Sequence, residues 1–261
     1  MIDTNVYLSH WPFRRLPLDE TDALVAKLRA AGIAQAWAGS FDGLLHKDVT
    51  AVNARLADEC ARHADLLLPF GAINLALPDW QGDVRRCRES HGMHGIRLHP
   101  NYHGYRLDDP RFGELLTLAG QHRLIVQVVV RMEDDRTQHP LVRVPGVDLT
   151  NLANVLAAQP QVQVQLLNSG RDVTPTLLRE LAELPNVWLD FAMTEGVGGV
   201  AQLAGDFHMD RVLLGTYAPF FPVESSLLKL DESELGHTLR DRFTRKNAEQ
   251  LTRLAGKKPG Q

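Results

Sequence analysis

The chain is poor in the features that mark secreted, membrane-spanning and disulfide-rich proteins. Its only cysteines, Cys60 and Cys87, lie in segments with a helical pattern and show no CxxC spacing, which predicts reduced, structural thiols. No apolar run approaches the roughly 20 residues that a membrane span requires. A strand predicted from residue 2 leaves no room for a signal peptide. We therefore expect a cytoplasmic protein without a membrane partner.

The chain also lacks an excess of basic residues. Lys and Arg number 28 against 32 Asp and Glu, which gives a formal net charge of -4. Nucleic-acid-binding proteins usually carry a basic surface that attracts phosphate groups, so nucleic acid is not an expected partner. We expect a small-molecule substrate instead, and a homo-oligomer stays open as an alternative to a monomer.

Several nucleotide and nucleophile motifs are missing as well. No GxGxxG turn follows a predicted strand, and the run GSFDG at 39–43 lacks Walker spacing. No G-x-S-x-G nucleophile elbow is present. These absences argue against a dinucleotide-binding sheet, a phosphate-binding loop and serine-based hydrolysis.

Short runs rich in Val, Ile and Leu alternate with segments of helical period along the whole chain. Strands are expected at 2–8, 33–38, 66–73, 95–99, 124–130, 162–167, 187–192 and 211–215. Helices are expected at 18–32, 50–64, 79–92, 111–122, 149–159, 174–184, 198–208, 224–230 and 232–255, with Asp19 as the cap of the first. Eight strand-helix units without a linker predict one α/β domain over 1–261, a single (β/α)8 TIM barrel.

The first strand, IDTNVYL, carries polar side chains in alternation. With the two-residue period of a strand, Asp3, Asn5 and Tyr7 share one face, and Ile2, Thr4, Val6 and Leu8 share the other. A solvent-facing edge strand would explain this pattern, but a barrel has no edge strand. We therefore expect the polar face to point toward the barrel axis and to belong to a site.

The segments that directly follow the predicted strands are rich in polar residues, and barrel enzymes bind substrates at that end of the barrel. We expect His10, His99, His103, Glu133, Asp134, Arg136, His139, Asn168, Glu195 and Tyr217 to converge on one rim. The aromatic turns WPF at 11–13 and PFFP at 219–222 could wall a pocket, although a buried collar or a subunit contact explains them equally well. Lys229 could place a cation near the pocket, but a lysine at helical spacing more often faces solvent.

Four motifs resemble the amidohydrolase-related barrel family (amidohydrolase family 2). They are IDTNVY from residue 2, GIRLHP at 95–100, NSG at 168–170 and VLLGTYAP at 212–219. The corresponding family patterns are I-D-x-H-x-H, G-[IV]-K-L-H-P, H-x-G and [LI]-F-G-S-D-x-P. The resemblance spans almost the whole chain and implies a TIM barrel with its active site at the C-terminal mouth.

The chain departs from this family at the positions that bind metal. Where the family has histidines and an aspartate, this sequence has Asn5, Tyr7, about Val129, Asn168 and Tyr217. Arg97 occupies the position of a lysine that some family branches carboxylate. Amides and phenols do not replace imidazole and carboxylate ligands of Zn²⁺. The sequence therefore predicts a divergent branch with no metal and no cofactor. A relocated zinc site of His10, His99, His103 and Glu133 is the alternative.

The loops after the fourth and fifth predicted strands supply the expected catalytic groups, since neighbouring strands bring these loops together. These groups are His99, His103, Asp134 and Arg136, which offer an imidazole, a general base and an anion clamp. Structural histidines and a solvated charged loop are the alternatives. The expected substrate-binding residues are Asn5, Tyr7, His10, Trp11, Arg97, Tyr102, Arg131, Glu133, Asn168 and Tyr217.

The sequence and the resemblance together predict a metal-independent hydrolase. Its substrate would be a small anionic organic molecule with a C–N or C–O bond to break, such as an amide, a lactam or a lactone. Two alternatives remain open at this point. The first is a decarboxylase of the same superfamily, and the second is a catalytically silent barrel that serves in binding or assembly.

Overall fold

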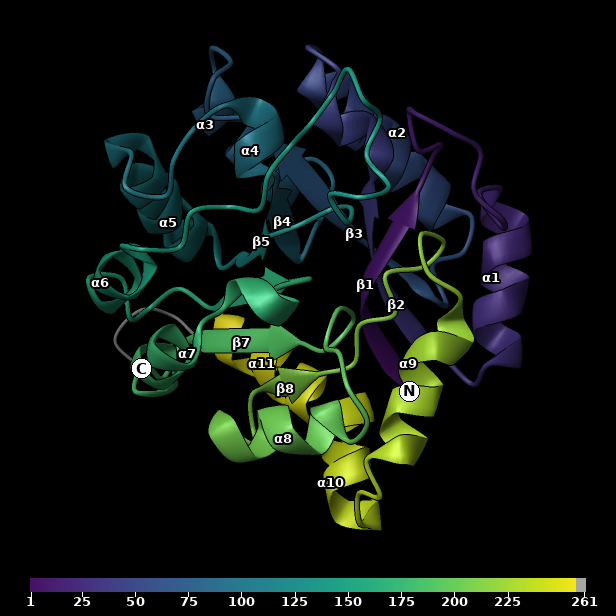
Figure 1. Ribbon diagram of the computed structural model, residues 1–261. Coiled ribbons are helices and arrows are strands. Elements are labelled where there is room, and N and C mark those ends of the chain that lie inside the picture. The colour runs from purple at the N-terminus through teal and green to yellow at the C-terminus, as the bar shows by residue number, and fades with distance from the viewer. Residues whose placement is uncertain (257–261) are drawn as a thin grey trace.

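The computed structural model describes residues 1–256, and its eight strands form one parallel sheet in the order of the chain (Figure 1). The strands are β1 (Ile2–Leu8), β2 (Gln35–Ser40), β3 (Leu67–Ile73), β4 (Gly95–Leu98), β5 (Ile125–Val129), β6 (Val164–Leu167), β7 (Val187–Asp190) and β8 (Val212–Leu213). Backbone hydrogen bonds from Thr4 to Leu214 and from Tyr7 to Ala218 join β1 to the segment that directly follows β8 and so close the ring. The predicted (β/α)8 TIM barrel is therefore confirmed, and residues 257–261 of the predicted domain lie outside the described residues.

Helices surround this ring of strands on its outside (Figure 1). The main ones are α1 (Thr21–Ala30), α2 (Val49–Ala61), α3 (Trp80–Glu89), α5 (Pro110–His122), α6 (Leu152–Ala157), α7 (Pro175–Ala182), α8 (Gly199–Asp206) and α9 (Val223–Glu232). The chain continues through α10 (His237–Asp241) and a π-helical turn, η3 (Arg242–Lys246), into α11 (Asn247–Ala255). Within residues 1–256, no helix combines the length and the apolar character needed to cross a membrane.

Side-chain caps fix the starts of several helices. Asp48 accepts a hydrogen bond from the backbone of Ala51 at α2, and Thr174 accepts one from Leu177 at α7. The prediction for α1 was wrong, because its N-cap position is Glu20 and not Asp19. The Asp19 carboxylate instead accepts two hydrogen bonds from the Arg15 guanidinium.

The polar face predicted for the first strand points into the barrel. Asp3, Asn5 and Tyr7 are completely buried. The Asn5 amide donates hydrogen bonds to Asn168 after β6 and to Asp190 on β7, across the interior. Thr4 departs from strict alternation, because the pairing register of β1 with β2 shifts between Asp3 and Val6. Its hydroxyl therefore also faces the interior, where the Gln165 amide donates to it.

A glycine in β2 makes room for a large side chain at the barrel axis. A Cβ atom added to Gly39 would lie 2.7 Å from Nη1 and 2.9 Å from Cδ of Arg97. Contacts this short do not occur in real structures, so a larger residue at position 39 would displace the guanidinium. The sequence of β2 thus allows β4 to place an arginine at the centre of the barrel.

Candidate active site

Arg97 is the cation at the centre of the barrel. It is completely buried, and its guanidinium donates hydrogen bonds to Gln127 Oε1 at 2.8 Å and to two backbone carbonyls, Val6 at 2.8 Å and Trp37 at 3.1 Å. It also lies over the Tyr7 ring, with Cζ 4.5 Å from the ring centroid. Each of the three guanidinium nitrogens therefore has an acceptor within the protein, and the role of Arg97 in substrate binding stays a prediction.

Two buried carboxylates accompany this cation. Asp190 accepts hydrogen bonds from the Asn168 backbone and the Asn5 amide, and Asp3 accepts them from the backbones of Asn5 and Thr216. Burial is the main reason that the pKa of Asp3 rises to about 7 and that of Asp190 to about 6. Sequence analysis missed Asp190, although a single acidic residue inside the run VWLDFA was a usable signal.

The raised pKa of Asp3 has a measurable consequence. A carboxyl group whose pKa is higher in the folded state stabilises the fold most below its unfolded pKa, and this contribution is lost as pH rises through the folded pKa. We expect the Asp3→Asn variant to gain stability relative to wild type by about 1.4 kcal/mol per pH unit between roughly pH 4 and 7. Urea unfolding at four pH values measures this difference. A difference that does not change with pH would contradict the assignment of the proton to Asp3.

Aromatic side chains fill the mouth of the barrel above this network. We call Tyr7, Trp11, Phe41, Tyr217 and Phe220 the aromatic plug. Ring centroids are 4.6 Å apart for Tyr7 and Phe41, 5.1 Å for Trp11 and Phe220, and 4.9 Å for Tyr217 and Phe220. Four of these rings are almost completely buried, and Phe220 is partly exposed. The plug covers the axis, so open space at the mouth lies to one side of it.

The structure does not bring the four predicted catalytic residues together. His99 is buried with Nε2 2.9 Å from the Tyr7 hydroxyl, and His103 is buried with Nε2 2.9 Å from the Gly43 carbonyl. Burial lowers the pKa of both imidazoles. His103 is the last residue of the short helix α4 (Pro100–His103), and His99 is the residue before this helix. The sequence pattern did not predict this helical turn. Strand-end position alone therefore did not indicate exposure to substrate.

Asp134 and Arg136 contact each other instead of the histidines. The Arg136 guanidinium donates to both Asp134 oxygens, at 2.9 and 3.0 Å, while its own side chain is 85 % exposed. Hydrogen bonds from Arg136 hold the pKa of Asp134 well below its usual range. Asp134 is therefore ionised at neutral pH and is a weak proton acceptor.

The other predicted binding residues are divided between the plug, the rim and one cavity. His10 is exposed and pairs with Glu20, whereas Glu133 is buried and pairs with Arg14. Tyr102 packs edge-on against Trp11. The four residues of the alternative zinc site each have separate partners and do not form a common site. Among residues 1–256, His10, Asp19 and Glu20 are the one group of three or more His, Cys, Asp or Glu side chains with ligand atoms within 4.8 Å of one another.

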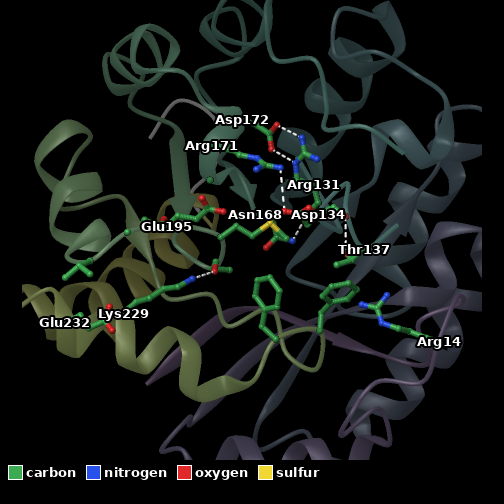
Figure 2. A pocket seen from close by; sticks show the side chains of 18 residues that line it. Arg14, Arg131, Asp134, Thr137, Asn168, Arg171, Asp172, Glu195, Lys229 and Glu232 are labelled. Atoms are coloured by element: carbon green, nitrogen blue, oxygen red, sulfur yellow. Dashed lines mark hydrogen bonds and ion pairs between the residues drawn. The ribbon is translucent and has the colours of Figure 1, made fainter. Parts of the chain in front are cut away.

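A cavity of about 640 Å³ opens beside the plug, over the C-terminal ends of β5 to β8 (Figure 2). We call it the mouth cavity. Phe220 and Phe221 contribute aromatic surface, and Asn168 lies at its base. The remaining lining residues are Arg14, Arg131, Asp134, Thr137, Gly170, Arg171, Asp172, Ala192, Met193, Thr194, Glu195, Gly196, Val197, Lys229 and Glu232. Its volume suits a small organic ligand.

Arginine-carboxylate pairs form one wall of the mouth cavity. Arg131 donates to both oxygens of Asp172 at 2.7 Å and to Asp135 at 2.6 Å. Arg171 lies 3.7 Å from Asp134. Sequence analysis singled out Arg131 and Asp134 but neither Arg171 nor Asp172, although both belong to the polar run NSGRD after β6.

Three residues at strand ends adopt a left-handed backbone conformation. Ser9 after β1, Asn168 after β6 and Tyr217 after β8 have φ values of 64°, 56° and 59°. This conformation costs free energy in residues other than glycine and is found preferentially at functional sites. Two of the three, Asn168 and Tyr217, lie beside the mouth cavity or in the plug, which supports this end of the barrel as the functional end.

A family model described as amidohydrolase matches residues 8–254 of the chain. A comparison with curated proteins gives no match. The matched range includes three of the four motifs, at 95–100, 168–170 and 212–219, and it reaches the first strand only at Leu8.

Solved structures of three decarboxylases have a similar fold. For 2,6-dihydroxybenzoate decarboxylase from Rhizobium, the TM-score is 0.76 at 16% identity, with 97% of this chain and 100% of that chain covered. For dihydroxybenzoic acid decarboxylase from Polaromonas, with bound manganese and 2-nitroresorcinol, it is 0.74 at 14% identity over 97% and 96%. For 5-carboxyvanillate decarboxylase from Novosphingobium aromaticivorans, complexed with manganese, it is 0.74 at 17% identity over 97% and 95%. At these identities the likeness concerns the fold.

These structures correct one expectation from the sequence. The chain was expected to have no metal and no cofactor, whereas two of the structurally similar decarboxylases bind manganese. Replacement of individual ligand residues therefore does not establish that the chain binds no metal.

The side chains at the axis of this barrel do not fit a divalent cation. Asp3 and Asp190 are the carboxylates there, and their oxygens already accept hydrogen bonds from backbone and amide N–H groups. Arg97 places a positive charge beside them, which opposes a second cation. Manganese prefers several oxygen or imidazole ligands. A divalent cation at the axis would therefore have to displace these hydrogen bonds and lie beside the positive charge of Arg97.

Proposed function

The chain belongs to the amidohydrolase family, and we propose that it is an enzyme that decarboxylates a small carboxylic acid with a flat apolar body. The mouth cavity carries this proposal. It combines aromatic surface from Phe220 and Phe221 with basic side chains, at the barrel end where enzymes of this fold bind substrates. The similar folds of decarboxylases that act on aromatic acids support the same class of reaction.

Decarboxylation makes modest demands on protein side chains. The bond between the carboxylate carbon and the substrate body breaks, CO2 leaves, and the electron pair stays on the body until a proton replaces the lost group. A conjugated body delocalises that electron pair. Phenylalanine rings can hold such a body in place, and the open cavity admits water as the source of the proton.

Hydrolysis, the leading prediction from the sequence, has less support. It needs a general base that can reach a water molecule and accept its proton. Asp134 lines the mouth cavity but is held ionised by Arg136, which makes it a weak base. His103 is buried against the Gly43 carbonyl and does not line this cavity. We therefore place decarboxylation ahead of hydrolysis.

Asp134 keeps a role in this proposal as a positioning residue. Its carboxylate lies 3.7 Å from Arg171, which also lines the mouth cavity. A negative charge at this distance favours an Arg171 conformation near the cavity wall. We propose that Arg171 contacts the substrate body or its substituents while Asp134 limits its movement.

A catalytically silent binding protein is the second candidate. One observation favours it: the aromatic plug occupies the barrel axis, where family members carry their reactive groups according to the motifs above. Such a protein would bind the same acids in the mouth cavity without changing them.

A substrate panel separates these two candidates. Purified protein is incubated with benzoic acids that carry hydroxyl, methoxy or amino groups, each with and without added manganese, and CO2 release is measured together with loss of the acid. We expect at least one acid to release CO2, and we expect Arg171→Gln to slow that reaction about tenfold by loss of one charge-assisted contact. Binding without CO2 release across the panel would support the silent barrel. Hydrolysis of amide or lactone analogues in its place would restore the first prediction.

A further inference from the structure

The charges that line the mouth cavity are unequally partnered. Arg14, Arg131 and Arg171 each lie within 4.0 Å of a carboxylate. Lys229 on α9 is different, because no carboxylate of residues 1–256 lies within that distance of its ammonium group. It is therefore the one cation of the cavity lining whose charge is not balanced by a direct ion pair within the described part of the chain.

Lys229 is half-buried and does not extend into solvent. Its ammonium group donates a hydrogen bond to the backbone carbonyl of Ala192, just after β7. Figure 2 shows the side chain running from α9 toward the cavity, on the side opposite Arg14. Burial lowers the pKa of this group, and the negative charges of Asp190, Glu195 and Glu232 act in the opposite direction. The sequence pattern had favoured a solvent-facing lysine at this position.

Acidic side chains stand on the same side of the cavity. Glu195, in the loop after β7, and Glu232, at the end of α9, both line the cavity and are exposed. Neither forms an ion pair within 4.0 Å with any described residue of the cavity lining. Their charges repel any anionic ligand, and the repulsion is larger for a ligand with two negative groups than for a ligand with one.

We propose that Lys229 is the specificity-determining residue that binds the carboxylate of the ligand, and that the mouth cavity selects monocarboxylic over dicarboxylic acids. The inference rests on the proposed function only in placing the ligand in this cavity. One free cation can neutralise one carboxylate. The arginines of the lining are already paired, with Glu133, Asp172 and Asp134, so none of them is free for a second carboxylate. Phe220 and Phe221 then contact the apolar body of the acid.

Binding of benzoate and terephthalate tests this inference without any turnover. Isothermal titration at pH 7 compares the wild type with Lys229→Met, Lys229→Gln and Lys229→Arg. We expect benzoate to bind about 10- to 100-fold more weakly to the Met and Gln variants, the usual loss for one charge-assisted hydrogen bond. Lys229→Arg should stay within a few-fold of wild type. The Gln variant can still donate to the Ala192 carbonyl, so it separates the loss of charge from the loss of that hydrogen bond.

Two controls complete the experiment. Lys246→Met removes the same charge from a residue that pairs with Asp241 outside the cavity, and we expect no change in benzoate affinity. Wild type should bind terephthalate more weakly than benzoate. Glu195→Gln removes one repelling charge, so it should reduce the difference in affinity between the two acids. Equal benzoate affinity in wild type and both neutral Lys229 variants, or no benzoate binding by wild type, would overturn the inference. If binding depends on Lys229 but no acid is decarboxylated, the inference stands and only the proposed reaction fails.

Discussion

Arg97→Met is expected to lower the free energy of unfolding by about 3–5 kcal/mol, the usual result of removing one member of a buried charged network. Methionine fills much of the space but cannot donate hydrogen bonds. Gln127 Oε1 and the carbonyls of Val6 and Trp37 would each lose a donor inside the barrel. The buried Asp190 would also lose the cation whose charge favours its ionised form.

Urea unfolding followed by circular dichroism measures this loss. Arg136→Met is the matched control, because it removes the same charged group from a side chain that is 85 % exposed, and we expect little change in its unfolding midpoint. Arg97→Lys keeps the charge but not the three hydrogen bonds of the guanidinium. We therefore expect its loss of unfolding free energy to lie between those of Arg97→Met and Arg136→Met. An Arg97→Met protein as stable as wild type would show that the barrel interior does not need this cation.

The architecture could be predicted because each barrel unit repeats the same local pattern. β1 has the predicted bounds, and the other seven strands overlap their predicted ranges. The first and last residues of several strands differ from the prediction. Backbone pairing determines where a strand begins and ends, and the hydrophobic pattern does not encode that pairing. Residues 33–34 are apolar and were assigned to a strand, but β2 begins at Gln35. β8 pairs over only Val212 and Leu213, because the following residues turn toward β1.

The site was harder to predict, since position after a strand does not determine what a side chain contacts. His99 and His103 follow β4 as expected, yet the turn of α4 directs them into the protein. Helical spacing favoured a solvent-facing Lys229, whereas this residue is half-buried, lines the mouth cavity and donates to the Ala192 carbonyl. The polar face of β1 was predicted correctly because strand alternation is a local rule, and because eight repeated units implied a closed barrel with an interior for that face.

Asp190→Asn is expected to lower the free energy of unfolding by about 3–5 kcal/mol, as much as the loss of Arg97. We expect this loss even though asparagine has the same shape as aspartate. One Asp190 oxygen accepts from the Asn168 backbone at 2.9 Å, and the other accepts from the Asn5 amide at 2.6 Å. An asparagine must place its own NH2 group against one of these donors, whichever way it is turned. The negative charge that favours Arg97 is lost at the same time. Since Asn168 lines the mouth cavity, we also expect weaker benzoate binding by this variant.

Asp3→Asn is the matched control for Asp190→Asn, because it replaces the other buried carboxylate of the barrel interior by the same amide. Asp3 contacts the Thr216 hydroxyl at 2.5 Å, and a hydroxyl group can act as donor or acceptor. A protonated Asp3, or an asparagine in its place, can therefore keep a partner there, whereas Asp190 faces N–H donors alone. One proton on Asp3 leaves Asp190 and Arg97 as the two opposite charges of the interior, which balances the network. We expect the urea midpoint of Asp3→Asn at pH 7 to lie at or above that of wild type, and the midpoint of Asp190→Asn to lie far below it. The reverse order of the two variants would place the proton on Asp190 and would require a different account of the barrel interior.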